Sequence, residues 1–222
     1  MRLALLGGTG DIGQGLALRW GYNTDRELLI GSRDPEKARN KAEEYTTELE
    51  SRGVEADIKG FENAMAADRA DVVICSVPAY HLVETIDAVA DRLDDDTVLV
   101  TPAVGMKRDD GGLHYNRPGA GSVTALAADA APDSVALVGA FHNLPAGRLA
   151  DLDATFEWDT VIVGDDEDAK EIVATLAEDI DGLRALDGGG LGNAAEVEAV
   201  TPLLINLAMN NEGLHDLGVR FQ

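Results

Sequence analysis

The chain begins with MRLALLGGTGDIGQGLALRW (residues 1–20), the stretch that indicates the fold most directly. Residues 3–6 are an apolar run of strand length, and residues 12–20 have the apolar spacing of a helix. Between them, Gly8, Gly10 and Gly13 form the pattern Gly-x-Gly-x-x-Gly. Between a strand and a helix this pattern is typical of dinucleotide-binding folds, although it also occurs as a tight structural turn.

Each glycine of this loop has its own expected role. Gly8 would permit the tight turn, Gly10 would let the backbone approach a pyrophosphate, and Gly13 would let the helix pack closely on the strand. The N-terminus of the helix would offer free N–H groups to the phosphates. Thr9 and the pair Asp11-Ile12 are therefore candidate cofactor-binding residues together with the glycines.

Further apolar runs and helical patterns alternate along the rest of the chain. Strands are expected at residues 28–30, 54–60, 71–77, 97–101, 134–140, 160–163 and 183–186, and helices at 35–51, 81–93, 122–131, 167–179 and 194–210. Residues 103–121 are expected to be a loop. This order predicts an α/β protein with a Rossmann-like, doubly wound, mostly parallel sheet and a small C-terminal helical cap. We expect a nucleotide-binding domain at residues 1–150 and a smaller α/β cap at 151–222.

The composition excludes several classes of protein. The 222 residues carry 41 acidic and 18 basic side chains, a net charge of −23, which argues against a nucleic-acid partner. No apolar run has the roughly 20 residues of a membrane helix and no signal peptide is apparent, so a cytoplasmic protein is expected. The lone Cys75 excludes a disulfide framework and a thiolate metal site. The acidic surface resembles those of cytoplasmic proteins from salt-loving archaea.

The end of the second expected strand indicates which dinucleotide fits. An NAD site usually has an acidic residue there, whereas this chain has Ser32 and Arg33. The Arg33 guanidinium can bind a 2′-phosphate with two hydrogen bonds, Ser32 can donate another, and Lys37 adds a charge one turn later. Asp34 would repel that phosphate unless it caps the following helix. The pattern therefore favours NADP, the alternative being that Arg33 is an ordinary surface arginine.

No catalytic residues stand out. The four histidines have no metal-site spacing, no Ser, His and acid set is apparent, and Cys75 is expected to be an inert core residue. We expect His114 and His215 at the surface. Such a chain suits direct hydride transfer between two bound cofactors, which needs alignment and a dry pocket more than an acid or a base.

Seven blocks, in order along nearly the whole chain, resemble the F420-dependent NADP oxidoreductase family. They are residues 3–20, 31–38, 77–81, 141–153, 156–170, 179–184 and 200–206. The resemblance implies hydride transfer between NADP(H) and the 8-hydroxy-5-deazaflavin coenzyme F420. It also implies a homodimer, and that residues 151–222 close the coenzyme pocket.

The resemblance also implies roles for individual residues. Thr9 and its neighbouring glycines would hold the pyrophosphate, and Ser32, Arg33 and Lys37 the 2′-phosphate. The remaining implied cofactor-binding residues are Val77 and Pro78 beside the nicotinamide, His81 in the same motif, Ala146 at the carboxamide, His142, Leu144 and Pro145 beside the deazaflavin, and Leu207 closing the cavity. The chain departs from the family at Asp34, often basic there, at Ala79-Tyr80, usually Trp-Glu, and in the loop at 104–108.

Several alternatives stay open from the sequence. A similar fold could reduce an imine, a carbonyl or a flavin with NADPH, and His142 or Tyr80 would then be the candidate proton donor. A non-catalytic NADP sensor would bind NADPH without turnover. His142 could instead be a core histidine satisfied by backbone groups, and His81 could simply begin a helix. The loop cations Lys107, Arg108 and Arg117 could attract the phosphate and glutamate tail of the deazaflavin or lie on a flexible loop.

Overall fold

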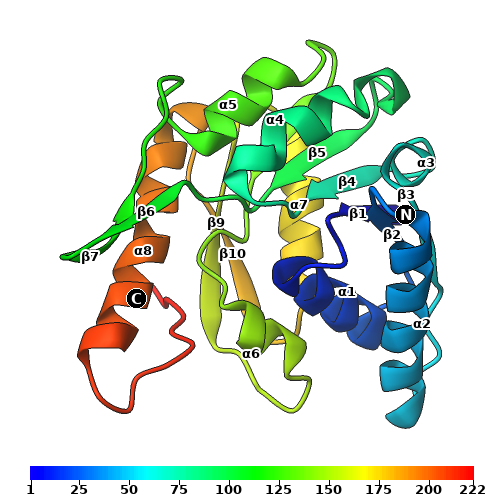
Figure 1. The fold of residues 1–222 in the computed structure, drawn as a ribbon, viewed down its shortest axis with the longest axis horizontal. Coiled ribbons are helices and arrows are strands. Elements are labelled where there is room, and N and C mark those ends of the chain that lie inside the picture. Colours follow the sequence, from blue (N-terminus) through cyan, green and yellow to red (C-terminus); the bar gives the residue numbers. More distant parts are fainter.

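An eight-stranded sheet forms the centre of the computed structural model, which describes residues 1–222 (Figure 1). Its strands are β1 (Arg2–Leu6), β2 (Glu27–Ser32), β3 (Ile58–Glu62), β4 (Val72–Cys75), β5 (Val98–Thr101), β8 (Ala136–Gly139), β9 (Trp158–Gly164) and β10 (Leu183–Asp187). They lie in the order β10-β9-β8-β5-β4-β1-β2-β3, and all pairs are parallel except β8 with β9. The expected Rossmann-like, mostly parallel sheet is confirmed.

Helices cover both faces of this sheet. One face carries α1 (Asp11–Asn23), α2 (Pro35–Ser51) and α7 (Glu167–Glu178), and the other carries α3 (Asn63–Ala67), α4 (Ala79–Asp87) and α5 (Val123–Ala130). Along β1, Leu3 and Leu5 pack in the first layer with Trp20, while Leu6 packs in the second with Leu82. Successive strand residues face opposite sides, so one buried strand contributes to both cores.

Helix α2 begins where the sequence predicts. Asp34 is its N-cap, and its Oδ1 accepts hydrogen bonds from the backbone N–H groups of Glu36 (2.9 Å) and Lys37 (3.2 Å). Pro35 occupies the first helical turn, where a missing N–H costs nothing. The expectation that the Asp34 carboxylate turns toward the helix amides is confirmed, and such a cap contributes about 1 kcal/mol to stability.

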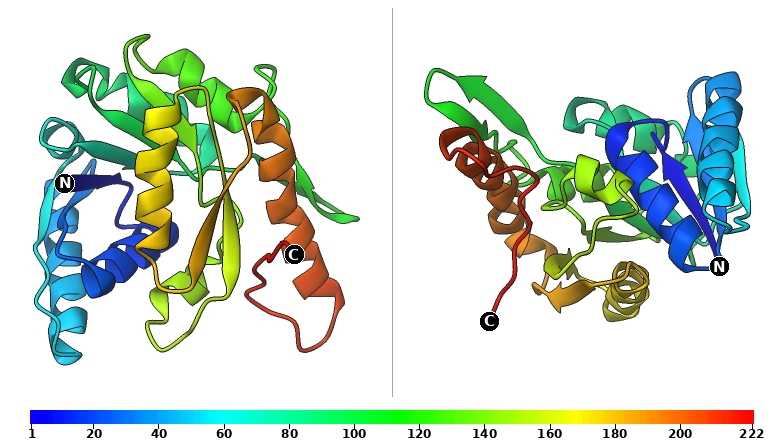
Figure 2. Two further views of the ribbon diagram at one scale, coloured as in Figure 1. Left: turned by 180° about the vertical axis from the view of Figure 1, so that it is seen from behind. Right: turned by 90° about the horizontal axis from the view of Figure 1, so that it is seen from below.

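The last third of the chain adds α6 (Ala146–Ala150) and α8 (Ala194–Asn210) to strands β9 and β10. Both strands belong to the same sheet as the first 150 residues. Beyond α8 the chain turns back alongside this helix (Figure 2). There the Asp159 N–H donates to the Val219 carbonyl (2.7 Å), and the Phe221 N–H donates to Asp159 Oδ2 (2.6 Å). The tail is thereby attached to β9.

The prediction that residues 103–121 form a loop is wrong, because this segment contains a hairpin of β6 (Met106–Asp109) and β7 (Gly112–Tyr115). The hairpin is largely exposed, so it lacks the apolar alternation that reveals a half-buried strand. Asn206 on α8 pairs with the backbone of β7: its Oδ1 accepts from the Leu113 N–H (2.9 Å) and its Nδ2 donates to the Leu113 carbonyl (2.6 Å).

Smaller differences concern element boundaries. The helix expected at 81–93 ends at Asp87 and is followed by a 3₁₀ turn, Ala90–Arg92. The third strand lies at 58–62 instead of 54–60, and the short helices α3 and α6 were not expected. A second 3₁₀ turn, Leu191–Asn193, precedes α8. None of the helices has both the length and the apolar character needed to span a membrane.

Candidate active site

A cavity of about 900 Å³ opens at the carboxyl edge of the sheet, where ligands bind in open α/β folds. It collects segments that follow β1, β4, β5 and β8, together with one face of α8 and part of the tail. The lining residues are Gly10–Ile12, Ser76–Ala79, Pro102–Val104, Met106, His142–Ala146, Thr201, Leu204, Ile205, Ala208, Met209 and His215–Leu217. Residues from both halves of the chain therefore share one cavity.

The glycine loop turns differently from the expectation in one respect. The left-handed backbone (φ 78°) belongs to Gly7, so the turn depends on Gly7 as well as on Gly8, where a Cβ would lie 2.7 Å from the Leu5 carbonyl oxygen. At Gly13 a Cβ would lie 2.5 Å from the Gly8 Cα, so this glycine permits the close packing expected of it. A Cβ at Gly10 would meet only the Gly7 oxygen, at 3.3 Å, so Gly10 is open toward the cavity.

Helix α1 starts at this loop without a side-chain cap. Gly10 is the N-cap residue and has no side chain to accept from the first amides. Uncapped N–H groups and the helix dipole make such a terminus suitable for a phosphate. Behind the loop, the buried Tyr45 hydroxyl donates to the Gly8 carbonyl (2.8 Å). Burial raises the pKa of Tyr45, so the phenol stays neutral and remains a donor.

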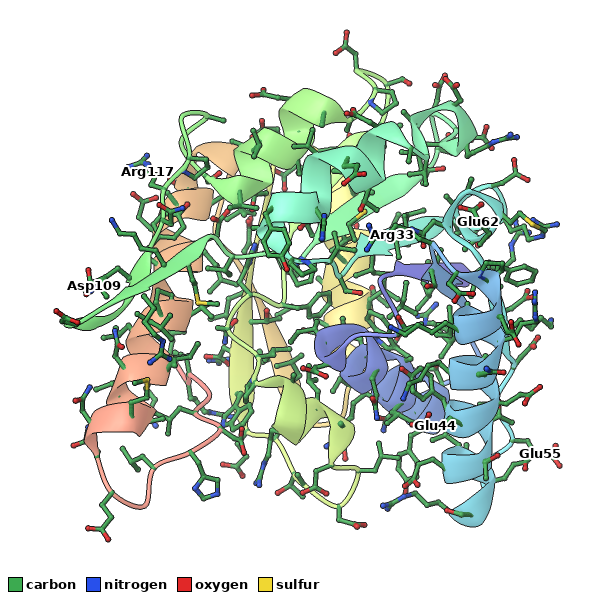
Figure 3. The ribbon with its side chains drawn as sticks, viewed as in Figure 1. Arg33, Glu44, Glu55, Glu62, Asp109 and Arg117 are labelled. Atoms are coloured by element: carbon green, nitrogen blue, oxygen red, sulfur yellow. The ribbon has the colours of Figure 1, made fainter.

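Ser32 is the last residue of β2, the strand next to β1, and Arg33 and Lys37 follow it. They do not line the main cavity. Ser32 is nearly buried, and its Oγ accepts from the Asp34 N–H (3.2 Å). Arg33 and Lys37 are exposed and take part in no ion pair. Figure 3 shows Arg33 between α1 and α4. Two free cations thus lie beyond the strand end next to the glycine loop.

Of the residues expected at the site after β4, some line the cavity and others do not. Val77 and Pro78 line the cavity. His81 does not: its side chain is 36% exposed, and its Nδ1 lies 3.5 Å from the Glu84 carboxylate. Its ring is tilted by 54° against that of Tyr80, with the ring centres 4.5 Å apart. Tyr80 is 82% exposed and also lies outside the lining, so it is not placed as a proton donor within the cavity.

The segment after β8 forms the opposite wall, with His142, Leu144, Pro145 and Ala146 all in the lining. The His142 ring is buried, and its Nε2 lies 3.3 Å from Thr124 Oγ1 while its Nδ1 has no protein partner. Burial lowers the pKa of His142 to about 4, so the imidazole is neutral near pH 7. The alternative of a core histidine satisfied by backbone groups does not hold for its ring.

Arg19 on α1 fixes this wall from behind. Its guanidinium donates to the carbonyls of Leu149 (2.9 Å), Arg148 (3.1 Å), Ala154 (3.0 Å) and Asp151. These carbonyls include those at the C-terminal end of α6, whose N-terminus carries Ala146. One buried side chain therefore links the glycine-loop helix to the segment that forms the other wall.

Helix α8 closes the cavity with a different face from the one expected. Leu204 and Ala208 line the cavity, whereas Leu207 is 42% exposed and does not. His215 is exposed, as expected, but it lies at the cavity rim. His114 is also exposed, with its Nε2 2.9 Å from Asp109.

The loop cations and the lone cysteine are also placed. Lys107, Arg108 and Arg117 are exposed on or beside the hairpin and line no part of the cavity; Figure 3 shows Arg117 and Asp109 in this region.

Cys75 is fully buried, which raises its thiol pKa to about 12, in agreement with an inert core residue. No group of acidic, histidine or cysteine side chains could hold a metal ion.

Sequence reasoning missed several cavity residues. Pro102–Val104 follow β5, and the rule that ligands bind at the carboxyl ends of parallel strands could have indicated them. Asn143 lies within an expected segment; its Nδ2 donates to the Asp159 carbonyl (2.8 Å), and its buried Oδ1 has no partner. The tail residues His215–Leu217 carry no local pattern that indicates a pocket.

Comparison with known proteins agrees with this arrangement. Residues 2–105 match the family described as NADP oxidoreductase coenzyme F420-dependent. The F420-dependent NADP reductase of Methanocaldococcus jannaschii is 41% identical, over 93% of this chain and 92% of that protein. The chain belongs to the F420-dependent NADP reductase family. The enzyme of the same name from Methanothermobacter marburgensis is 39% identical, over 99% of this chain and 97% of its own length.

The solved structures support the fold assigned to this member of the family. A protein from Arthrobacter sp. FB24 superimposes with a TM-score of 0.78 over 100% of this chain and 99% of its own, at 22% identity. A UDP-D-ManNAc dehydrogenase from Pyrococcus horikoshii covers 95% of this chain, with 50% of its own length matched, at a TM-score of 0.63 and 15% identity. The family model and the relatives of 38–41% identity confirm the sequence resemblance to F420-dependent NADP oxidoreductases.

Proposed function

We propose that this chain is an oxidoreductase that transfers a hydride directly between NADP(H) and coenzyme F420. The observation that carries the proposal is near full-length identity of 38–41% to proteins named F420-dependent NADP reductase. The cavity is consistent with it. At about 900 Å³ it is near the upper end of the usual range for small-molecule sites, so it has room for two ring systems.

The residues present fit both coenzymes. The uncapped α1 terminus and the open side of Gly10 suit a pyrophosphate, and the unpaired Arg33 and Lys37 suit a 2′-phosphate. In the opposite wall, the buried Nδ1 of His142 and Oδ1 of Asn143 have no protein partner, so each can serve a polar group of a ligand. When bound, NADPH and the deazaflavin supply the hydride donor and acceptor carbons.

The role proposed for the protein is alignment and exclusion of water. Val77, Pro78, Leu144, Pro145 and Ala146 contribute mostly apolar surface to the cavity. Burial keeps His142 neutral, so it adds no charge beside the reacting rings. Direct hydride transfer needs the reacting carbons about 3–3.5 Å apart and no obligatory acid or base.

We also propose that the two parts of the chain bind different coenzymes. Residues 1–150 would bind NADP through Gly8–Gly13, Ser32, Arg33 and Lys37. Residues 151–222 would close the coenzyme F420 pocket over the wall at 142–146, with α8 contributing Leu204 and Ala208. Leu207 and His81 lie outside the lining, so we assign them to its periphery.

An absorbance assay tests the proposal directly. Purified protein in molar KCl is mixed with oxidised coenzyme F420 and either NADPH or NADH. We expect the deazaflavin band to disappear with NADPH and much more slowly with NADH. Binding of NADPH without any bleaching would overturn the F420 assignment. A panel of imines, carbonyls and flavins would then separate another reductase from an NADP sensor that turns over nothing.

We also propose that the chain is a cytoplasmic homodimer. Helix α8 exposes apolar side chains outside the cavity lining, including Leu203 (55% exposed) and Leu207 (42%). Burying such a face against a second copy would remove it from water. Light scattering coupled to gel filtration in molar KCl tests this; a mass near 23.4 kDa would contradict it.

A further inference from the structure

A fully buried carboxylate lies behind the cavity, outside the residues discussed so far. Glu198 on α8 is 0% exposed and does not line the cavity. Its Oε1 accepts from the Thr124 N–H (2.8 Å) and the Thr124 hydroxyl (2.8 Å). Its Oε2 accepts from the Val123 N–H (3.0 Å) and the Tyr115 hydroxyl (2.7 Å).

These four donors indicate that Glu198 is ionised. A carboxylate has about four lone-pair positions, and all of them have a donor here. A protonated carboxyl would have to direct its own proton at one of these donors. The N-terminus of α5, where Val123 and Thr124 lie, also favours a negative charge. Glu198 is therefore an acceptor only.

The carboxylate determines the orientation of the Thr124 hydroxyl. A threonine hydroxyl has one proton, and here that proton is donated to Glu198. Thr124 Oγ1 can then offer only a lone pair to His142 Nε2, 3.3 Å away. In a neutral imidazole one nitrogen carries the proton and the other accepts. Nε2 must therefore carry the proton, which leaves Nδ1 without one.

We propose that Glu198 is a positioning residue: acting through Thr124, it holds His142 as the Nε2–H tautomer and keeps Nδ1 as an acceptor for an N–H or O–H donor of a bound coenzyme. His142 lines the cavity, and its Nδ1 is buried without a protein partner. The neighbouring Asn143 Oδ1 is a second buried acceptor without a partner in the same wall. The nature of the ligand, a heterocyclic coenzyme, rests on the proposed function; the tautomer does not.

The competing explanation is that Glu198 only ties α8 to β7 and α5. Tyr115 provides the matched control, because Tyr115→Phe removes one hydroxyl donor from the same carboxylate but leaves the Thr124 link intact. Thr124→Val removes the other hydroxyl donor and the link, with almost no change in side-chain shape. A purely structural tether would respond to both substitutions alike.

The first test reads the tautomer itself. The full chain is labelled with ¹⁵N-histidine, and the ring resonances of His142 are assigned by comparison with His142→Gln. In the wild type and in Tyr115→Phe we expect a protonated Nε2 and an unprotonated Nδ1. In Thr124→Val and Glu198→Gln we expect both resonances to move toward the average of the two tautomers. A protonated Nδ1 in the wild type, or no change in Thr124→Val, would overturn the proposal.

The second test measures binding without turnover. Equilibrium dialysis gives the Kd for oxidised coenzyme F420 and, separately, for NADP⁺. We expect Thr124→Val and Glu198→Gln to weaken F420 binding about tenfold, the typical effect of one misplaced hydrogen bond. Tyr115→Phe should leave it unchanged, and NADP⁺ binding should change in none of them. Equal weakening in Tyr115→Phe and Thr124→Val would reduce Glu198 to a structural tether.

The outcomes separate this proposal from the one before it. If the wild type binds no F420, the proposed function fails, while the ¹⁵N spectra still decide the tautomer. If the wild type binds F420 and the Thr124→Val protein binds it equally well, only the positioning role fails. If Glu198→Gln does not fold, Thr124→Val carries the test, and thermal unfolding of each variant verifies its fold.

Discussion

The hydroxyl of Tyr45 on α2 donates a 2.8 Å hydrogen bond to the carbonyl oxygen of Gly8, across 37 positions of sequence. The bond is buried, and Gly8 belongs to the loop expected to carry the pyrophosphate. A side chain of the helix that follows β2 thereby supports the loop that follows β1. The geometry of the glycine loop consequently depends on α2 as well as on its own glycines.

Removing this bond gives the first prediction. Tyr45→Phe leaves the Gly8 carbonyl buried without a donor, so we expect the free energy of unfolding to fall by about 1–3 kcal/mol. The KM for NADPH should rise as the loop loosens, with little change in kcat. Urea unfolding and steady-state kinetics measure both. Unchanged stability with unchanged KM would show that the loop keeps its geometry without the Tyr45 hydrogen bond.

We expect Arg33 to stabilise bound NADP equally in the ground state and in the transition state. Arg33→Ala should raise the KM for NADPH at least about tenfold, the weight of a charge-assisted hydrogen bond, and leave kcat and the KM for NADH nearly unchanged. Arg39→Ala, which removes another exposed cation six positions later on α2, is the matched control and should behave as the wild type. A fall in kcat at constant KM would contradict this role of Arg33.

The buried His142 makes stability depend on pH. Its pKa is about 4 in the folded chain and near 6.5 when unfolded, because burial disfavours the cation. Between these values the unfolded state binds more protons, so its contribution to stability is complete above about pH 6.5 and is lost as pH falls toward 4. The loss is about 3 kcal/mol at most.

Comparing His142→Gln with the wild type isolates this effect from the many carboxylates. Urea unfolding is measured for both proteins at pH 7 and near pH 4.5. Between pH 7 and pH 4.5 the wild type should lose more unfolding free energy than His142→Gln loses. A difference that is independent of pH would show that His142 titrates normally.

Arg19 should be important for stability because its planar guanidinium serves several carbonyls at once. In Arg19→Lys the compact ammonium cannot reach them all, and we expect a loss of about 2–4 kcal/mol as buried carbonyls lose their donor. Arg69→Lys is the control, at a half-buried arginine that donates to one carbonyl and lies over the Phe61 ring, and it should lose clearly less. Similar losses in both variants would contradict the special role of Arg19.

The net charge of −23 predicts strong salt dependence. Raising KCl from about 0.1 M to about 1 M shortens the Debye length from about 10 Å to about 3 Å, which screens the repulsion between surface carboxylates. The Tm should therefore rise with KCl. An uncharged osmolyte of equal osmolality should raise it less; an equal rise would point to solvent exclusion instead of screening.

Local pattern was sufficient for the central sheet, the position of the glycine loop and the Asp34 cap. Apolar runs such as residues 71–77 report burial on both faces, and Asp34 before Pro35 is a helix start that acts within four residues. The seven motif blocks were sufficient for the family. Each of these signals operates over a short stretch of chain, where backbone preference and burial leave a readable periodicity.

Only the tertiary structure decided which side chains meet. Glu198 reaches Thr124 across 74 positions, Arg19 reaches Ala154 across 135, and the tail returns to β9 near Asp159. The same folding turns Leu207 and His81 away from the cavity and brings Asn143 into it. Periodicity indicates whether a residue is buried or exposed. The partner that the residue contacts depends on how distant elements pack, and no local sequence pattern contains this information.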